Sequence, residues 1–305
     1  MRIALFVAVV AVCGLGQTAA AESISVGAST RTYELHRPPI LAANRQNMPL
    51  LIVLHGGGGS GARVRQYLGM DAIANKQGFA VAYPDALGGT WNDGRYGSDA
   101  IKERPGGDDV AFLKALAQTL GARGLGSRGD AAIAGVSNGG MMVYRLACET
   151  SGVFSSYAAM LANMPVDLRK TCKPAQPTPM LILAGTGDQI MPYKGGKIAS
   201  ASGGVVQSAD DTYSYWGQSN RCSGPGNPVP LPDLDKSDGT KVELLTAHRC
   251  AARGDTVFLR IVGGGHQLPS RPAAQRGSVD RGTGAANHDI DAAEEIWSFA
   301  AGKRR

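Results

Sequence analysis

Short apolar segments alternate with helix-like segments along most of the chain, and this alternation constrains the fold more than any other feature. Leu50–Leu54, Phe79–Tyr83 and Met180–Ala184 are apolar segments of five residues, as expected of strands buried on both faces of a sheet. Between such segments, apolar residues recur at helical spacing, as in the segment from Asp108 to Leu120. The alternation predicts an α/β fold with a mostly parallel central sheet and helices on both faces.

The other expected elements follow the same pattern. Two antiparallel strands are expected over residues 23–36, with a turn at Gly27, and a closing helix is expected over 290–301. Residues 201–255 are the least regular part of the chain, and we interpret them as an elaborated insertion near the site within a single domain of residues 22–305. Further strands are expected at 131–134, 156–161, 242–246 and 256–262, and further helices up to Asn75 and over 140–148 and 210–218.

Residues 1–21 have the features of a secretory signal peptide. Arg2 supplies the positive charge, Ile3–Cys13 form an apolar run of 11 residues, and Ala19–Ala21 supply a small-residue cleavage site. The run is too short to span a bilayer, so an uncleaved anchor is the less favoured alternative. A lipoprotein cysteine at Cys13 is also disfavoured, because Val12 precedes it. We expect an extracellular or periplasmic protein with no membrane anchor after cleavage.

Four cysteines remain after removal of the signal: Cys148, Cys172, Cys222 and Cys250. An even count in an exported chain suggests two disulfides. Sequence order favours the pairs Cys148–Cys172 and Cys222–Cys250, although two other pairings and free buried thiols are alternatives. The chain has no C-x-x-C pair, which argues against a zinc site, and we expect no metal.

The charge of the chain excludes one class of function. The formal net charge is +6, but the basic residues are scattered and no basic segment carries interleaved aromatic residues. We therefore expect no nucleic-acid partner. Nothing in the sequence indicates an oligomeric state.

Glycine accounts for 42 of the 305 residues, about twice its usual share, and many of these glycines follow expected strands. The sharpest case is the segment GVSNGG over residues 135–140, a G-x-S-x-G between an expected strand and an expected helix. This is the context of a nucleophile elbow, in which glycines relieve a strained turn that presents the serine hydroxyl. Ser137 is the candidate nucleophile. The alternative is an ordinary serine in a glycine-rich turn.

A serine hydroxyl needs an adjacent base to act as a nucleophile. In proteins with a nucleophile elbow of this kind, the catalytic residues occur along the chain in the order serine, acid, histidine. His36 and His55 precede Ser137 and are therefore excluded as the base. His266 follows the expected strand 256–262 and a triglycine turn, at the strand end where catalytic groups gather. We expect it to be the base, with His248 and His288 as the alternatives.

The acid and the oxyanion donors are also expected in loops that follow strands. Asp188 comes directly after the expected strand 180–184, and its carboxylate would orient the imidazole. Asp167 and Asp210 are the alternatives. The developing oxyanion needs backbone N–H donors, which we expect from Asn138 and from Gly57 in the loop HGGGG. A phosphate-binding loop is the competing interpretation of that loop, but no Gly-Lys-Ser/Thr or G-x-G-x-x-G follows.

Trp91 and Asn92 follow the strand 79–83, so they are expected on the catalytic side of the sheet. Trp91 would stack on a substrate ring or wall the acyl pocket, although an aromatic residue is more often part of the core.

With these residues in place, the chain resembles the secreted polyhydroxybutyrate depolymerase and feruloyl esterase family, relatives of the family-one carbohydrate esterases. The resemblance implies an α/β-hydrolase fold, no metal or organic cofactor, an acyl-enzyme on Ser137, the acid at Asp188 and the base at His266. It spans most of residues 23–301 and rests on the stretches LIVLHGGGGS, TWNDG, DDVAFL, GVSNGGMMVYRLAC, GTGDQIMPYKGG, GGGHQLPS and HDIDAAEEIWSF.

One departure affects the expected substrate. Similar proteins often have Thr-Trp-Pro-Gly after the histidine, whereas this chain has Gln267–Ser270. The resemblance therefore implies a pocket wall beside His266 that includes Leu268 and is smaller and not aromatic. The chain also shows no linker to a terminal binding domain. We expect a serine ester hydrolase for short or oligomeric hydroxyalkanoate esters. A feruloyl or acetyl xylan esterase is the alternative, and a non-catalytic binding module is less favoured.

Overall fold

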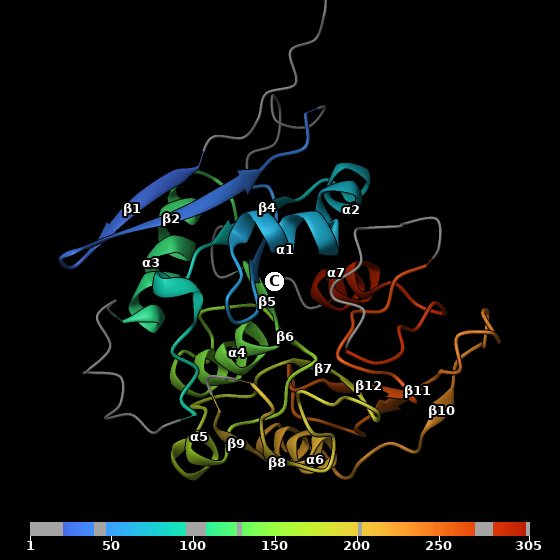
Figure 1. Ribbon diagram of the computed structural model, residues 1–305. Helices are drawn as coiled ribbons and strands as arrows, with labels where there is room; N and C mark the ends of the chain where they lie inside the picture. The colour runs from blue at the N-terminus through green and yellow to red at the C-terminus, as the bar shows by residue number, and fades with distance from the viewer. Residues whose placement is uncertain are drawn as a thin grey trace, which may run out of the picture.

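The computed structural model describes residues 21–39, 47–95, 108–126, 130–200, 203–271 and 283–302. The expected signal peptide, except for Ala21, lies outside these ranges. A single sheet in the order β1-β2-β4-β3-β5-β6-β7-β12-β11-β10 crosses the protein (Figure 1). Its strands are β1 (Glu22–Val26), β2 (Ser29–His36), β3 (Leu50–Leu54), β4 (Ala80–Pro84), β5 (Ala132–Val136), β6 (Tyr157–Met160), β7 (Met180–Gly185), β10 (Val229–Pro230), β11 (Lys241–Thr246) and β12 (Thr256–Val262).

The centre of the sheet is parallel. Strands β4, β3, β5, β6, β7 and β12 pair in parallel, while β1 and β2 at one edge and β11 and β10 at the other pair antiparallel. Because parallel strands place their carboxyl ends at one edge, the loops after β3, β5, β7 and β12 converge there. The expected mostly parallel sheet is confirmed.

Helices cover both faces, as expected. In β3, Leu51 and Val53 pack into a core with Val64 and Ile296, while Leu50, Ile52 and Leu54 pack into a second core on the opposite face. This alternation within one fully buried strand explains why the sequence is continuously apolar there. The first face carries α1 (Gly61–Leu68), α2 (Met70–Gln77) and α7 (Ala292–Gly302), and the second carries α3 (Asp109–Ala122), α4 (Asn138–Glu149), α5 (Val166–Thr171) and α6 (Ala209–Ser219).

The differences from expectation are local. The helix expected up to Asn75 is two helices, because Gly69 adopts φ 62° and ends α1. The sequence pattern missed the short helix α5, the small sheet of β8 (Gly196–Lys197) and β9 (Val205–Val206), the two-residue strand β10 and the 3-10 turn Leu87–Gly89. Elements of this length have too few residues to show a periodicity.

Residues 203–255 are part of the main fold. Strand β11 pairs with β12 over its whole length, and α6 buries Trp216 completely in the core beneath the sheet. The segment that the sequence suggested to be an insertion therefore extends the sheet and covers part of one face.

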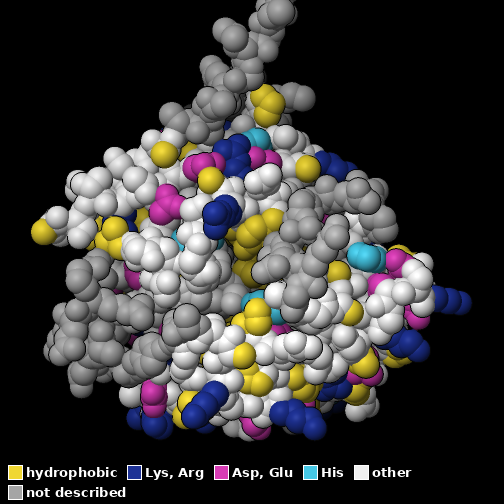
Figure 2. Space-filling view, viewed as in Figure 1, with side chains coloured by type: hydrophobic (Ala, Val, Ile, Leu, Met, Phe, Trp, Pro, Cys, Tyr) yellow, Lys and Arg dark blue, Asp and Glu magenta, His cyan; other side chains and the backbone are white. Residues whose placement is uncertain are grey.

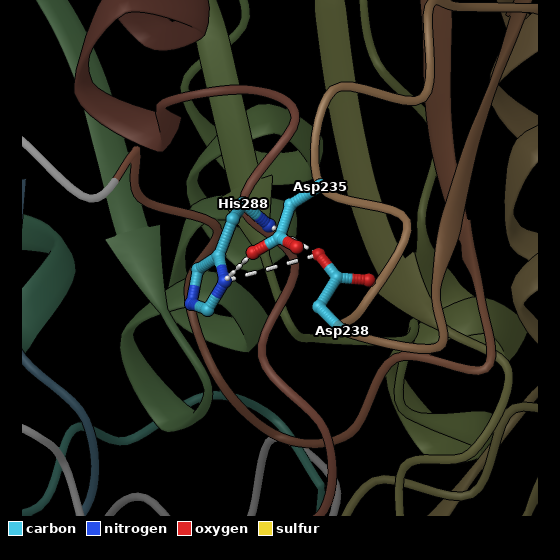
Figure 3. A group of neighbouring side chains, drawn as sticks. All are labelled: Asp235, Asp238 and His288. Carbon is cyan, nitrogen blue, oxygen red and sulfur yellow. Dashed lines mark hydrogen bonds and ion pairs between the residues drawn. The ribbon is translucent and has the colours of Figure 1, made fainter.

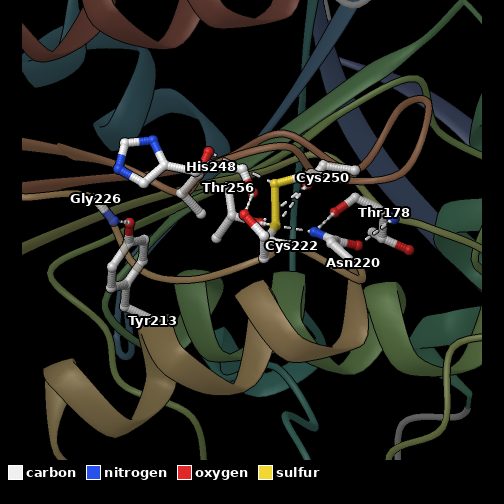
Figure 4. Close-up of a disulfide and its surroundings, with 11 residues drawn as sticks. Thr178, Tyr213, Asn220, Cys222, Gly226, His248, Cys250 and Thr256 are labelled. Atoms are coloured by element: carbon white, nitrogen blue, oxygen red, sulfur yellow. Dashed lines mark hydrogen bonds between the residues drawn. A yellow bond between two sulfur atoms is a disulfide. The ribbon is translucent and has the colours of Figure 1, made fainter.

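Both expected disulfides are formed. Cys148 at the end of α4 pairs with Cys172 at the end of α5, and Cys222 pairs with Cys250. Figure 4 shows the second bridge beside Asn220, whose side-chain amide donates to Thr178 O at 2.7 Å and accepts from Thr178 N at 2.7 Å. Among the described residues, no helix is both long enough and apolar enough to cross a bilayer.

Candidate active site

Ser137 occupies a strained turn between β5 and α4. Its backbone adopts φ 55° and ψ −117°, outside the regions that most side chains favour. The Ser137 N–H donates to Met160 O at 2.8 Å, which anchors the turn on β6. A Cβ at Gly135 would lie 2.2 Å from Gly139 O, and one at Gly139 would lie 2.5 Å from His55 O. The two glycines of the motif are therefore required by close backbone approach on both sides of the serine.

Asp188 and His266 form a pair at the ends of β7 and β12. His266 Nδ1 lies 2.6 Å from Asp188 Oδ2. The other carboxylate oxygen, Oδ1, accepts the N–H groups of Ile190 at 2.8 Å and Met191 at 2.7 Å. With Asp188 buried, these bonds fix the carboxylate, and its bond to Nδ1 leaves Nε2 of His266 for other contacts.

The alternative acids and bases lie elsewhere. Asp167 pairs with Lys170 on the surface, and Asp210 pairs with Arg260 and accepts from Tyr193. Neither is paired with a histidine in the described part of the chain. His248 is exposed, and His288 pairs with a separate acidic group described below.

Ser137 and His266 line the same cavity, which has a volume of about 600 Å³. Figure 2 shows the hollow near the centre of this face, with hydrophobic side chains inside it. The expected residues Gly57, Asn138 and Leu268 also line it. Much of the remaining wall is aliphatic or methionine: Val136, Met141, Leu161, Ile190, Met191 and Ile198.

The glycine loop after β3 lies against the start of α4. A Cβ at Gly57 would lie 3.6 Å from the Cβ of Asn138. The next two N–H groups are used within the backbone, Gly58 to Gly89 O at 2.8 Å and Gly59 to Gly56 O at 3.0 Å. Within the described residues, the N–H groups of Gly57 and Asn138 have no hydrogen-bond partner. These two N–H groups are thus available to an oxygen in the cavity.

His55 holds this loop in place. Ala86 N–H donates to its Nε2 at 3.0 Å, and its Nδ1 lies 2.7 Å from Gly56 O. A neutral ring with the proton on Nδ1 satisfies both contacts. Burial lowers the pKa of His55, which favours that neutral form.

Trp91 and Asn92 do not line the cavity, which corrects the expectation that they bind substrate. Trp91 is only 1% exposed, and its indole N–H donates to His55 O at 2.9 Å. The Asn92 N–H donates to Asp109 at 2.8 Å, and its carbonyl accepts from Arg145 at 2.7 Å. The loop after β4 thus packs against the start of the glycine loop through Trp91. These residues support the site without lining the cavity.

The sequence reasoning missed a buried polar group under Asn138. Asn138 Oδ1 accepts the Trp91 N–H at 2.8 Å, and its Nδ2 donates to Trp91 O at 3.0 Å and to Asp93 Oδ2 at 2.6 Å. Asp93 also pairs with Arg95, which lines the cavity. The sequence signal was the charged pair within four residues of Trp91, although a pattern alone cannot show that it is buried.

Two further lining residues were also missed, Arg63 and Tyr67 on α1. Their spacing of four residues places them on one helix face. Burial raises the pKa of the Tyr67 hydroxyl well above its ordinary value. This hydroxyl therefore stays protonated at neutral pH and can donate a hydrogen bond.

A second cluster of side chains has donor atoms that could hold a metal ion. The ligand atoms of Asp235, Asp238 and His288 all lie within 4.8 Å of one another (Figure 3). His288 Nδ1 lies 3.0 Å from Asp235 Oδ2, and the His288 N–H donates to Asp238 Oδ2 at 2.8 Å. Hydrogen bonds from Ser237 and His288 lower the pKa of Asp235. These contacts join the loop before β11 to the segment before α7, and none of the three residues lines the cavity.

Comparison with known proteins gives sequence relatives named as esterases. The chain is 28% identical to NocK of Nocardia uniformis subsp. tsuyamanensis, a protein named as an esterase, over 90% of this chain and 82% of that protein. It is 30% identical to feruloyl esterase B of Piromyces equi, over 65% of this chain. The chain spans only 38% of the length of that second protein.

Two further comparisons concern the fold. Residues 69–173 match the model of the prolyl oligopeptidase family, Peptidase_S9. Among solved structures, the acetyl xylan esterase of Aspergillus awamori aligns with a TM-score of 0.58 over 82% of this chain and 95% of that one, at 14% identity. Together with the parallel sheet, this structural similarity shows that the chain has the α/β-hydrolase fold.

Proposed function

We propose that the protein is a serine carboxylic-ester hydrolase that acts through Ser137, His266 and Asp188. One observation carries the proposal: the strained Ser137 turn and the His266–Asp188 pair open on the same cavity. In the first step, Ser137 Oγ forms a bond to the ester carbonyl carbon while His266 Nε2 takes its proton. Asp188 stabilises the imidazolium that results.

The negative charge then moves to the former carbonyl oxygen. The free N–H groups of Gly57 and Asn138 are placed to donate to it. As the carbon–oxygen bond to the alcohol breaks, His266 gives its proton to the leaving alkoxide, and the acyl group stays on Ser137. Water attacks the acyl-enzyme with its proton passing to His266, and the acid leaves as Ser137 recovers its proton.

The cavity wall favours aliphatic acyl groups. Tyr67 is the one Phe, Tyr or Trp side chain among its described lining residues, and Gln267 and Leu268, which follow His266, also line it. We infer short hydroxyalkanoate esters or their oligomers as substrates. The relative named feruloyl esterase B supports a second candidate, hydrolysis of plant cell-wall esters. The two disulfides support export of the protein, because such bonds persist in oxidising compartments.

Ser137→Ala tests the activity with 4-nitrophenyl butyrate as substrate. We expect kcat to fall by about 10⁴-fold or more, since loss of a nucleophile removes the whole covalent pathway. Ser214→Ala, on the exposed side of α6, is the matched control and should leave kcat unchanged. A fluorophosphonate probe should label the parent protein at one site and leave Ser137→Ala unlabelled. Activity of Ser137→Ala within tenfold of the parent would refute the mechanism.

A substrate comparison tests the acyl preference. Rates on methyl 3-hydroxybutyrate dimers and on methyl ferulate are measured with the same preparation. A higher kcat/KM on the dimers is expected, because the wall offers aliphatic contacts along its length. A preference for methyl ferulate would favour the second candidate.

A further inference from the structure

The charged side chains that line the cavity beside Ser137 are all basic. The cavity's described lining residues include Arg63 and Arg95 and no Asp or Glu. The charge of Arg95 is balanced by Asp93 beneath the site, at 2.5 Å. His266 is likewise balanced by Asp188. Arg63 differs from both, because no carboxylate in the described part of the chain pairs with it.

The backbone of Arg63 is held at the start of helix α1, and its exposed side chain lines the cavity. Ser60 caps the helix by accepting the Arg63 N–H. A Cβ at Gly61 would lie 2.2 Å from Tyr83 O, so the start of α1 packs closely on β4. Arg65 lies on another side of the helix and is held by Glu34 at 2.8 Å and Asp71 at 2.7 Å. Arg65 thus anchors α1 through its ion pairs, and Arg63 is available to bind a ligand in the cavity.

The surroundings of Arg63 define what it can bind. Tyr67 follows it by one helical turn on the same face and offers a protonated hydroxyl. Figure 2 shows a basic side chain at the margin of the hollow, above its hydrophobic wall. A guanidinium binds a carboxylate through two parallel hydrogen bonds, a geometry that the exposed side chain of Arg63 can offer at the rim of the cavity.

We propose that the cavity selects esters that carry a carboxylate, which Arg63 binds while the ester carbonyl lies at Ser137. The proposal rests on the proposed esterase function and specifies its substrate class. An oligomer of an aliphatic hydroxy acid with a free acid end has this chemistry. Its chain contacts the aliphatic wall, and its terminal carboxylate reaches the rim at α1. Neutral esters of the same length bind through the wall alone.

The test compares two forms of one substrate. The 3-hydroxybutyrate trimer is prepared as the free acid and as the terminal carboxamide, which differ in charge and little in size. With the parent protein, we expect kcat/KM to be about tenfold higher for the acid, mainly through a lower KM, since a contact present in both ground and transition states does not change kcat. Arg63→Gln should reduce this ratio to about one, and Arg63→Lys should retain part of it.

Lys76→Gln is the matched control, because it removes the same charge from an exposed position on α2 that does not line the cavity. Its acid-to-amide ratio should equal that of the parent. Raising NaCl from 20 to 500 mM should lower the parent ratio and leave that of Arg63→Gln unchanged. A parent ratio near one, or an equal ratio in the parent and Arg63→Gln, would overturn the proposal.

Binding measurements separate this proposal from the esterase activity itself. Calorimetry with Ser137→Ala should show tighter binding of the trimer acid than of its carboxamide, and the difference should disappear in the double variant with Arg63→Gln. Binding that discriminates without any turnover by the parent would refute the esterase mechanism and keep the carboxylate site. Turnover of both forms with equal affinity would refute the carboxylate site and keep the esterase.

Discussion

Gly135→Ala tests whether close backbone packing on both sides of Ser137 is required for activity. The added Cβ would lie 2.2 Å from Gly139 O and 2.4 Å from Gly139 C, and real Cβ contacts essentially never fall below 3.0 Å. The end of β5 and the start of α4 must therefore separate by about 0.8 Å, the difference between these distances. Both contacts are with backbone atoms, so no side chain can turn away to relieve them. Ser137 lies between the two elements and moves with them.

The expected effect has two parts. Displacement of a reacting group by about 1 Å costs on the order of 10²-fold in rate, and overpacking of a buried site costs about 1–3 kcal/mol. We expect kcat on 4-nitrophenyl butyrate to fall about 100-fold and Tm to fall by several degrees. Gly217→Ala on α6 is the control, since its Cβ meets only Ala247 Cβ, at 4.0 Å. It should keep full activity, and an alanine there should stabilise the helix by about 0.5–1 kcal/mol.

The reasoning would be refuted if Gly135→Ala retained kcat within threefold of the parent with an unchanged Tm. A lower Tm with full kcat would show that the packing stabilises the fold without positioning Ser137.

Three further predictions follow from the same geometry. Asp188→Asn should lower kcat about 10⁴-fold with little change in Tm, because an amide oxygen can still accept the two backbone N–H groups that Asp188 Oδ1 holds. Burial lowers the pKa of His55 in the folded protein. As the pH falls, His55 is therefore protonated in the unfolded chain before it is protonated in the folded protein. The free energy of unfolding should therefore fall below about pH 6.5, and calorimetry at pH 7.5 and 5.0 should show a smaller loss for His55→Gln. Replacing Cys148 and Cys172 by serine should lower the free energy of unfolding in urea by about 3 kcal/mol. Full kcat in Asp188→Asn would contradict the first prediction, and a pH dependence of His55→Gln equal to that of the parent would contradict the second. An unchanged urea midpoint in the double serine variant would contradict the third.

The sequence predicted the central sheet well because its signals are local. Leu50–Leu54 is apolar at every position and forms β3 with those bounds, since a strand buried on both faces leaves no polar position. Ser137, Asp188 and His266 follow the ends of β5, β7 and β12, as the sequence pattern predicted. Asp188 and His266 are 78 residues apart, and they lie close because they follow β7 and β12, which the structure shows to be parallel neighbours.

The sequence could not predict which side of a loop faces the cavity. Trp91 follows β4 as expected, but the hydrogen bond from its indole to His55 O turns the ring into the core. Arg63 and Tyr67 lie on a helix whose pattern shows amphipathicity without showing which neighbour each face meets. These placements depend on contacts between segments distant along the chain, and residue types do not specify such contacts individually.

Asn138 shows how the two kinds of information combine. Its place directly after Ser137 predicts a backbone N–H donor, and any residue type would satisfy that requirement. The structure explains why the side chain is an amide: it accepts from the Trp91 N–H and donates to both Trp91 O and Asp93. An aspartate there would lose the donor and place two carboxylates in contact in a buried site, which is strongly unfavourable. The loop after β4 thus constrains the residue next to the candidate nucleophile through its side chain, while the cavity constrains the same residue through its backbone.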